Sequence, residues 1–290
     1  MKIENTLSFI IILLFSCNIY SYNANNPCEK LMQEGNNLDA VTAAKKINDQ
    51  YDKHFCLGKA YYRSNMYDFA VKSFTDSEEH AKLPVDQMFS MLYKGIAERD
   101  LGKFDSSTKT FTKGLETAKL GNTKYLQMER RFLYQLGHNN LAKEDYLEAI
   151  DYFAKSTVVS ANDNERAEGY DGLAMAYYGK KKTNKAIEYG LKAANTYRKV
   201  GAYNEYADAQ IKLSSYHLGD NAPDRALDVL QKLERFAKDN GSRYYEAKAL
   251  LEQSLVFKHK NDEQNAIDSL NIGTNIAKEI GAKDLLSATK

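Results

Sequence analysis

The sequence predicts an all-α protein, a right-handed superhelical solenoid built of antiparallel helix pairs. Apolar residues recur at three- and four-residue intervals, which gives each segment one stripe to bury. The 290 residues include only 3 prolines, which favours long uninterrupted helices. A pattern of small and aromatic residues also repeats along the chain. Because no helix pair can bury its stripe alone, we expect the pairs to stack into an array with a concave face.

The repeated pattern has similar parts in most repeats. The first helix of a pair carries two small or apolar residues and then a Tyr or another apolar residue, as in Leu57-Gly58 and Tyr61. The second helix carries a small residue followed one turn later by a larger one, as in Ala149 and Phe153. The small residues of the second helices are Ala70, Ser107, Ala149, Ala186, Ala226 and Ala266.

These residues resemble the tetratricopeptide repeat (TPR) family, in which a Leu-Gly pair and a Tyr precede an Ala and a Phe. The resemblance covers residues 51–281, and two departures stand out. The family's usual period is about 34 residues, whereas the small residues here recur about every 40 residues, as in the extended repeats of the family. The chain also has no Trp, the residue that often opens the first helix.

The pattern divides the chain into four parts. Residues 1–21 are predicted to be a signal peptide, and residues 22–50 an N-terminal segment with degenerate capping helices broken at Gly35. Residues 51–281 are predicted to form six TPR-like helix pairs, followed by a C-terminal tail over 282–290. At the helix ends, Gly121, Gly241 and Gly281 are expected to adopt the left-handed conformation that stops a helix, and Pro223 is expected in a first turn.

The first residues differ in composition from the rest. Lys2 precedes an apolar run from Leu7 to Phe15, which is shorter than the roughly 20 residues that span a bilayer. A basic start and a short apolar run are typical of a secretory signal peptide, with cleavage expected after Ser21. The alternative is a lipoprotein anchored to the membrane through Cys17. Export to the periplasm or the medium is therefore expected, with membrane attachment only if Cys17 is lipidated.

The two remaining cysteines, Cys28 and Cys56, suggest a disulfide in an exported chain. A bridge between them would hold the leading segment against the first complete helix pair. The alternative is two free thiols, with Cys56 buried and Cys28 exposed.

The sequence carries no catalytic constellation, glycine-rich phosphate loop or metal-binding motif. We therefore expect no enzyme activity, no cofactor and no metal. The 40 basic and 39 acidic residues balance, whereas nucleic-acid binders usually carry a basic field. Nucleic acid is therefore not an expected partner.

The inner curve of the predicted solenoid is the candidate binding surface. A second stripe of the first helices is more apolar and aromatic than a solvated face should be, and basic residues edge it. A groove for a protein or peptide segment is one interpretation, and packing against the next repeat is the other. The candidate groove residues are Phe55, Lys59, Tyr62, Arg63, Leu92, Ile96, Arg99, Arg131, Tyr134, His138, Met175 and Tyr178.

The TPR resemblance allows this surface to be tested against known groove chemistries. The carboxylate-binding Lys and Asn pairs of chaperone-binding members are not matched, because Leu92 and Ile96 stand at two of their places. Extended-repeat members often place an Asn before the Leu-Gly pair to hold a peptide backbone, and here only Gln135 could imitate it.

The predicted function is an exported scaffold that binds a protein or peptide segment in its concave groove. One alternative is an assembly subunit that associates through its ends and convex face. The other is a helical-array cell-wall enzyme, which would need a catalytic Glu in a compact domain that the repeats leave little room for.

Overall fold

The computed structural model describes residues 27–287 and divides the chain into two compact units, Met1–His80 and Ala81–Lys290. The predicted signal peptide over 1–21, including Cys17, lies outside the described residues. Between residues 27 and 287 the chain is helical and contains no strand. Consecutive helices pack against each other within each unit, so the predicted all-α solenoid of antiparallel helix pairs is confirmed.

The first unit contains two short helices followed by two longer ones. The short pair lies in the segment predicted to cap the array, and the chain turns between them at Gly35, whose φ is +82°. The helices of this unit are α1 (Pro27–Gln33), α2 (Asn37–Ala44), α3 (Gln50–Arg63) and α4 (Tyr67–His80).

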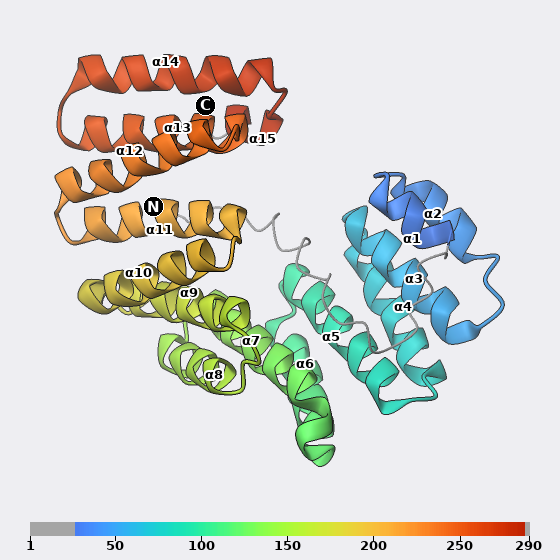
Figure 1. Ribbon diagram of the computed structural model, residues 1–290. Coiled ribbons are helices and arrows are strands. Elements are labelled where there is room, and N and C mark those ends of the chain that lie inside the picture. The colour runs from blue at the N-terminus through green and yellow to red at the C-terminus, as the bar shows by residue number, and fades with distance from the viewer. Residues whose placement is uncertain (1–26, 288–290) are drawn as a thin grey trace. The chain divides into compact units, whose positions relative to one another are not determined.

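The second unit continues the pattern with longer helices, and Figure 1 shows α11 to α14 lying side by side. Its helices are α5 (Pro84–Asp100), α6 (Phe104–Leu120), the 3-10 helix η1 (Asn122–Tyr125), α7 (Leu126–Ala142), α8 (Tyr146–Val158), α9 (Asp163–Gly179), α10 (Thr183–Lys199), α11 (Tyr203–Gly219), α12 (Pro223–Asp239), α13 (Arg243–His259), α14 (Glu263–Glu279) and α15 (Lys283–Ser287).

The small residues of the repeated pattern lie at the closest helix contacts. All six small residues of the second helices, from Ala70 to Ala266, are fully buried. In the α7–α8 pair, a Cβ added to Gly137 would lie 2.7 Å from the ring of Phe153. The same interlock joins Gly58 to Phe74 and Gly95 to Phe111. The glycine therefore makes room for the ring, which explains why the two residue types recur at a fixed spacing.

Two of the three predicted glycine stops are confirmed. Gly241 and Gly281 both have φ of +69°. Gly121 instead has φ of −84°, and Asn122 takes the left-handed position with φ of +49°. The prediction for Gly121 was wrong because the chain does not turn directly into the next helix there but enters η1 first. Pro223 is in the first turn of α12, as predicted.

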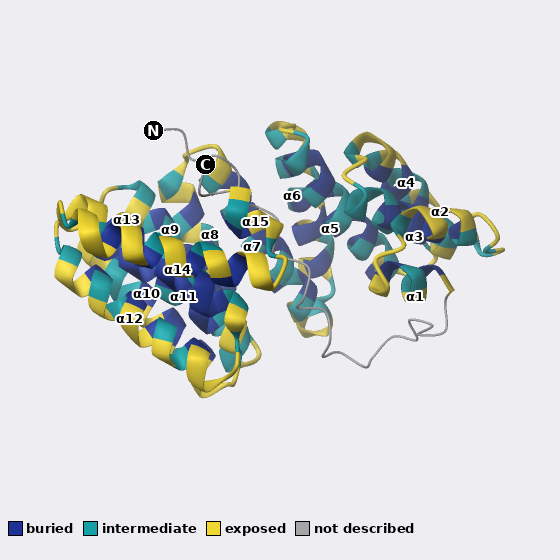
Figure 2. Cartoon of the chain, turned by 90° about the horizontal axis from the view of Figure 1, so that it is seen from above, coloured by how far each residue is buried: buried dark blue, intermediate teal, exposed yellow. Residues whose placement is uncertain are grey.

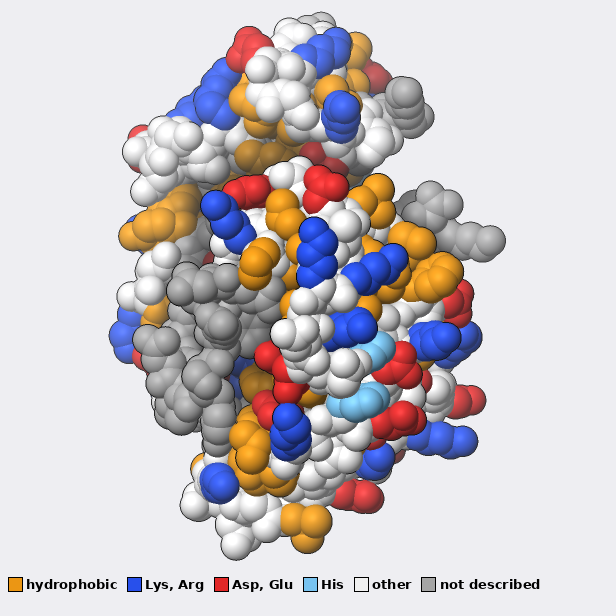
Figure 3. Space-filling view, turned by 90° about the vertical axis from the view of Figure 1, so that its right-hand side faces the viewer, with side chains coloured by type: hydrophobic (Ala, Val, Ile, Leu, Met, Phe, Trp, Pro, Cys, Tyr) orange, Lys and Arg blue, Asp and Glu red, His pale blue; other side chains and the backbone are white. Residues whose placement is uncertain are grey.

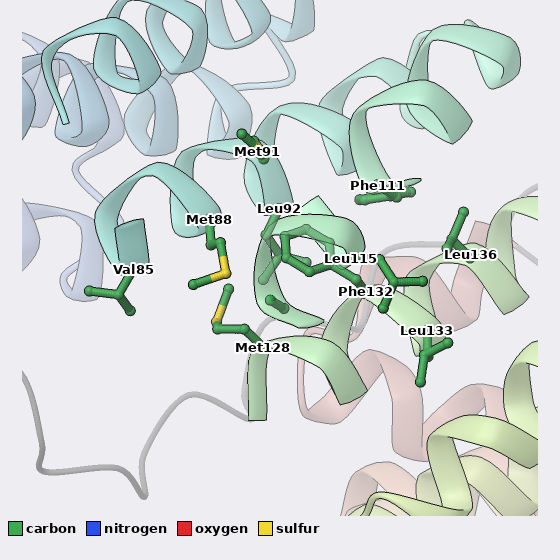
Figure 4. Packing of buried hydrophobic residues seen from close by; sticks show 11 residues of the cluster. Val85, Met88, Met91, Leu92, Phe111, Leu115, Met128, Phe132, Leu133 and Leu136 are labelled. Atoms are coloured by element: carbon green, nitrogen blue, oxygen red, sulfur yellow. The ribbon is translucent and has the colours of Figure 1, made fainter. Parts of the chain in front are cut away.

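A hydrophobic cluster joins the first three helices of the second unit (Figure 4). Phe111 of α6 and Phe132 of α7 are fully buried in it, and α5 contributes Met88 and Met91. Figure 2 shows that the buried residues lie between the helices, while the outer sides of the helices and the turns are exposed. Each first helix therefore has a core side and a side left for other contacts.

Part of the segment predicted as a C-terminal tail over 282–290 is helical. Residues 283–287 form the short helix α15, and Leu285 is buried against Ala247, Leu250 and Ile276. This apolar contact covers part of α13 at the end of the array. None of the helices in the described part of the chain is long and apolar enough to cross a membrane.

Candidate functional site

The first helices of the second unit define its inner face. They are α5, α7, α9, α11 and α13, and they alternate along the chain with the second helices of the pairs. Contacts join α5 to α7, α7 to α9 and α11 to α13, whereas the described second helices make no comparable contacts with one another. Because the first helices approach one another more closely, they lie on the inside of the curve, as in a solenoid with a concave face.

A ladder of polar pairs links successive first helices across this inner face. Each pair joins residues about one repeat apart, so each rung connects two neighbouring repeats. The rungs, which we call the polar ladder, are Arg99–Gln135 (2.8 Å), Arg130–Glu168 (2.8 Å), Asp171–Lys212 (2.5 Å) and Asp208–Lys248 (2.8 Å), with Tyr244–Asp284 (2.6 Å) joining α13 to the short helix α15 at the last step. Partly buried pairs of this kind fix the register of the helices they join.

The predicted groove residues of the second unit differ in exposure. Leu92 and Arg99 are less than a tenth exposed, so they pack between helices and do not line an open surface. Ile96, Arg131, Tyr134, His138 and Met175 are partly exposed. Tyr178 is 37% exposed and is the most accessible of the predicted set in this unit. The packing interpretation therefore holds at α5, and the surface opens toward α9.

In the first unit, the structure places the four predicted groove residues on α3. Phe55 is buried against Phe74, with ring centroids 5.8 Å apart, and so belongs to the core. Lys59 donates to Glu29 of α1 at 2.7 Å. Tyr62 and Arg63 are partly exposed. Of these four residues, two therefore hold the unit together.

The predicted basic edge is largely engaged inside the protein. Arg99 bonds to Gln135 and lies 3.9 Å from Asp100, while the Arg131 guanidinium lies 5.8 Å from the centre of the Phe89 ring. The Gln135 side chain, which could have held a peptide backbone, accepts the Arg99 bond. On the face seen in Figure 3, basic and acidic side chains are interspersed and neither sign forms a continuous field.

The most distinctive part of the inner face surrounds the Asp171 carboxylate on α9. One of its oxygens, Oδ2, accepts from Lys212, while Oδ1 is buried and has no hydrogen-bond partner among residues 27–287. Burial, followed by the charges of Glu168 and Asp171, raises the pKa of Tyr134 well above its ordinary value. Burial and then Asp171 raise the pKa of Tyr197 and of Tyr216 in the same direction.

The Tyr216 hydroxyl is also buried without a hydrogen-bond partner in the described part of the chain. The ring of Tyr216 lies 4.9 Å from that of Tyr178, measured between centroids, so the accessible tyrosine is next to the buried one. We call the group formed by Tyr134, Asp171, Tyr178, Tyr197, Lys212 and Tyr216 the Asp171 cluster.

His138 on α7 is next to this cluster, since its ring contacts that of Tyr134. Burial lowers the pKa of the His138 imidazole well below its ordinary value, and the positive charges of Arg99 and Lys212 lower it further. The ring lies 4.5 Å from the Tyr134 ring and 5.1 Å from the Phe153 ring. Its Nε2 is buried with no partner in the described residues. The imidazole is therefore neutral near pH 7.

Sequence reasoning missed much of this arrangement. It singled out none of Arg130, Glu168, Asp171, Lys212 and Tyr216 as site residues. A usable signal was present, because the partners of the polar ladder are complementary residues separated by 36 to 41 positions. Complementary residues one repeat apart are brought together when the repeats stack. Among the described residues, no group of His, Cys, Asp and Glu side chains is arranged to hold a metal ion.

The fold and the inner face define a helical-repeat protein of the TPR type. No family model matches the chain. A curated protein, response regulator aspartate phosphatase H of Bacillus subtilis (strain 168), is 24% identical over 183 residues, which cover 61% of this chain and 49% of that protein. The chain thus spans about half the length of the curated relative it matches.

Solved structures show the same fold. A signal transduction ATPase with a tetratricopeptide repeat sensor from Pyrococcus horikoshii matches 91% of this chain and 43% of its own, with a TM-score of 0.67 and 18% identity. The Rap conjugation gene regulator of the plasmid pLS20, solved in complex with the Phr* peptide, matches 88% of this chain and 73% of its own, with a TM-score of 0.55 and 17% identity.

Proposed function

We propose that this protein is an exported scaffold that binds a peptide or protein segment on the inner face of its second unit. The observation that carries the proposal is a group of three of the buried polar atoms that have no partner in the described residues, His138 Nε2, Asp171 Oδ1 and the Tyr216 hydroxyl. They come from three successive first helices, α7, α9 and α11. Buried polar groups are normally hydrogen-bonded, so a bound segment crossing these helices would satisfy them.

The character of the inner face supports a peptide ligand. Next to Tyr216, Tyr178 is 37% exposed, and Leu255 of the first helix α13 is 55% exposed, which provides aromatic and aliphatic contact area. Helical-repeat proteins use such extended inner surfaces for binding. A protein of the same fold was solved in complex with the Phr* peptide, which supports a peptide as the class of ligand. Phosphatase activity, named for the curated relative, is not part of the proposal because the sequence offers no catalytic group for it.

The binding proposal can be tested with single substitutions on opposite sides of the array. Tyr178→Asp and Leu255→Asp place a charge on the inner face, whereas Leu191→Asp makes the same change at a 43% exposed position of the second helix α10. The measurements are partner capture from the native envelope and binding of a library of random hexapeptides. Both should fall for the inner-face variants and persist for Leu191→Asp. Equal binding by all three variants would contradict an inner-face site.

The export proposal rests on the apolar run before residue 21 and on the cysteine pair. The structure joins Cys28 and Cys56 in a disulfide, with Cα atoms 6.5 Å apart, and disulfides persist mainly in oxidising compartments. Residues 1–30 fused to a reporter should carry it across the membrane, and N-terminal sequencing should find a mature chain that begins after Ser21. A lipidated Cys17 would identify the lipoprotein alternative, and an intact Met1 on a cytosolic protein would contradict export.

A further inference from the structure

On one side of α9 the carboxylates outnumber their direct cationic partners. Glu165, Glu168 and Asp171 lie on one side of the helix, because they are three residues apart. Arg130 pairs with both Glu165 (3.3 Å) and Glu168 (2.8 Å), and Lys212 pairs with Asp171. On this side of the helix three carboxylates thus have two direct cationic partners, because Glu165 and Glu168 share Arg130. Elsewhere on α9, Asp163 pairs with both Arg166 and Lys199. Arg131 has the smallest of the named effects on the pKa of Glu168, and the Arg131 guanidinium lies over the Phe89 ring.

Asp171 Oδ1 is an acceptor without a partner in the described residues. The residue is 8% exposed, and its other oxygen, Oδ2, accepts from Lys212. The buried Tyr216, 3% exposed, has its hydroxyl free, and the accessible Tyr178 ring is next to it. A carboxylate oxygen, a hydroxyl and an aromatic face together suit a cationic group that donates hydrogen bonds. Such a group would make a charge-assisted hydrogen bond to the carboxylate and a cation–π contact with the aromatic ring.

We propose that the Asp171 cluster anchors a basic side chain, Arg or Lys, of the peptide segment bound on the inner face. This inference rests on the proposed function, because it names the chemistry of the ligand at that same surface. The segment lies across α9 and α11, its basic group bonds to Asp171 Oδ1 and the Tyr216 hydroxyl, and Tyr178 covers the stem of the side chain.

The next rung of the polar ladder provides a matched control. Asp208 forms the same kind of pair with Lys248, at 2.8 Å, but its second oxygen accepts from the Tyr245 hydroxyl at 3.2 Å. Both oxygens of Asp208 are therefore used within the protein. Asp171→Asn and Asp208→Asn remove the same charge and weaken equivalent inter-repeat pairs, but only the first removes a free acceptor.

The experiment uses the full oxidised chain and a positional-scanning library of acetylated, amidated hexapeptides at 150 mM salt. The wild-type protein should select Arg or Lys at one position. Replacing that Arg with uncharged citrulline, or that Lys with acetyl-lysine, should weaken binding about 10-fold or more, as for loss of a charge-assisted bond. In Asp171→Asn the two forms of the peptide should bind alike, and in Asp208→Asn the difference should remain.

Three results would overturn the inference. Selection of acidic residues, selection without charge preference, or a charge preference that survives Asp171→Asn would each exclude the basic anchor while leaving peptide binding intact. If the wild-type protein binds no hexapeptide at all, the proposed function fails together with this inference.

A second variant separates ligand binding from structure. Tyr216→Phe removes only the hydroxyl, which has no partner among residues 27–287. The melting temperature of the free protein should therefore stay the same or rise, because an unsatisfied buried group is lost, while affinity for the selected peptide should fall at least about 3-fold. Unchanged affinity would remove Tyr216 from the site, and a lower melting temperature would assign the hydroxyl a structural role.

Discussion

The two units hold their helices together by different means. In the first unit, α1 and α2 have 7 and 8 residues, and such short helices are marginal by themselves. The Cys28–Cys56 disulfide and the Lys59–Glu29 pair attach α1 to α3. In the second unit, helices of mostly 17 residues are long enough to interlock through their side chains. Where a helix is too short to bury a full stripe, as in α1, covalent and ionic links to α3 supplement the packing of residues such as Met32 and Val41.

The largest effect should come from breaking the covalent link. Replacing Cys28 and Cys56 with Ser opens a loop with a sequence separation of 28 residues, which should cost about 3–4 kcal/mol in a loop-entropy model. Hydrogen exchange should show loss of protection in α1 and α2 and little change in α9 to α14. Equal protection of α1 and α2 in the oxidised protein and in the double variant would mean that packing alone holds the leading helices.

A smaller effect should come from the interlock in the second unit. Gly137→Ala would normally stabilise a helix by about 0.5–1 kcal/mol, but here the new Cβ would lie 2.7 Å from the fully buried Phe153 ring. We expect a net loss of about 1–3 kcal/mol in the free energy of unfolding, measured by urea denaturation. Gly190→Ala is the control, because its nearest atoms lie at 3.3 Å, and it should stay within about 1 kcal/mol of the wild type. Stabilisation by Gly137→Ala would show that the ring can move aside.

The smallest effect should be the pH dependence contributed by His138. Its pKa is lowered in the folded protein, so the unfolded chain binds the proton first, and stability is lost as the pH falls below the ordinary histidine value of about 6.5. His138→Phe keeps an aromatic ring and removes the titration. Between pH 7 and 5.5 the wild type should lose at most about 1 kcal/mol more than this variant, measured as the difference in unfolding free energy. Parallel pH profiles would mean that His138 is not buried in its neutral form.

Both the fold and the spacing of its contacts were accessible from the sequence. The recurring small residues mark positions that become fully buried, and the aromatic residue that follows Ala149, Phe153, is the ring that interlocks with Gly137. The two cysteines also predicted the attachment of the leading helices. These features depend on contacts within one repeat or between neighbouring helices, so the local pattern of residue size and polarity is enough to specify them.

The tertiary structure alone decided which inner-face residues remain available for binding. The apolar stripe of the first helices looks alike in every repeat, yet Leu92 is buried by its neighbours while Tyr178 and Leu255 are exposed. The pattern of charges in the sequence likewise does not distinguish Asp171 from Asp208. Asp171 has one carboxylate oxygen without a hydrogen-bond partner in the described residues, whereas both oxygens of Asp208 accept hydrogen bonds. Both distinctions depend on how closely successive first helices approach and on which side chain from the next repeat arrives first. Those distances follow from the stacking of whole repeats, which no single segment of the sequence determines.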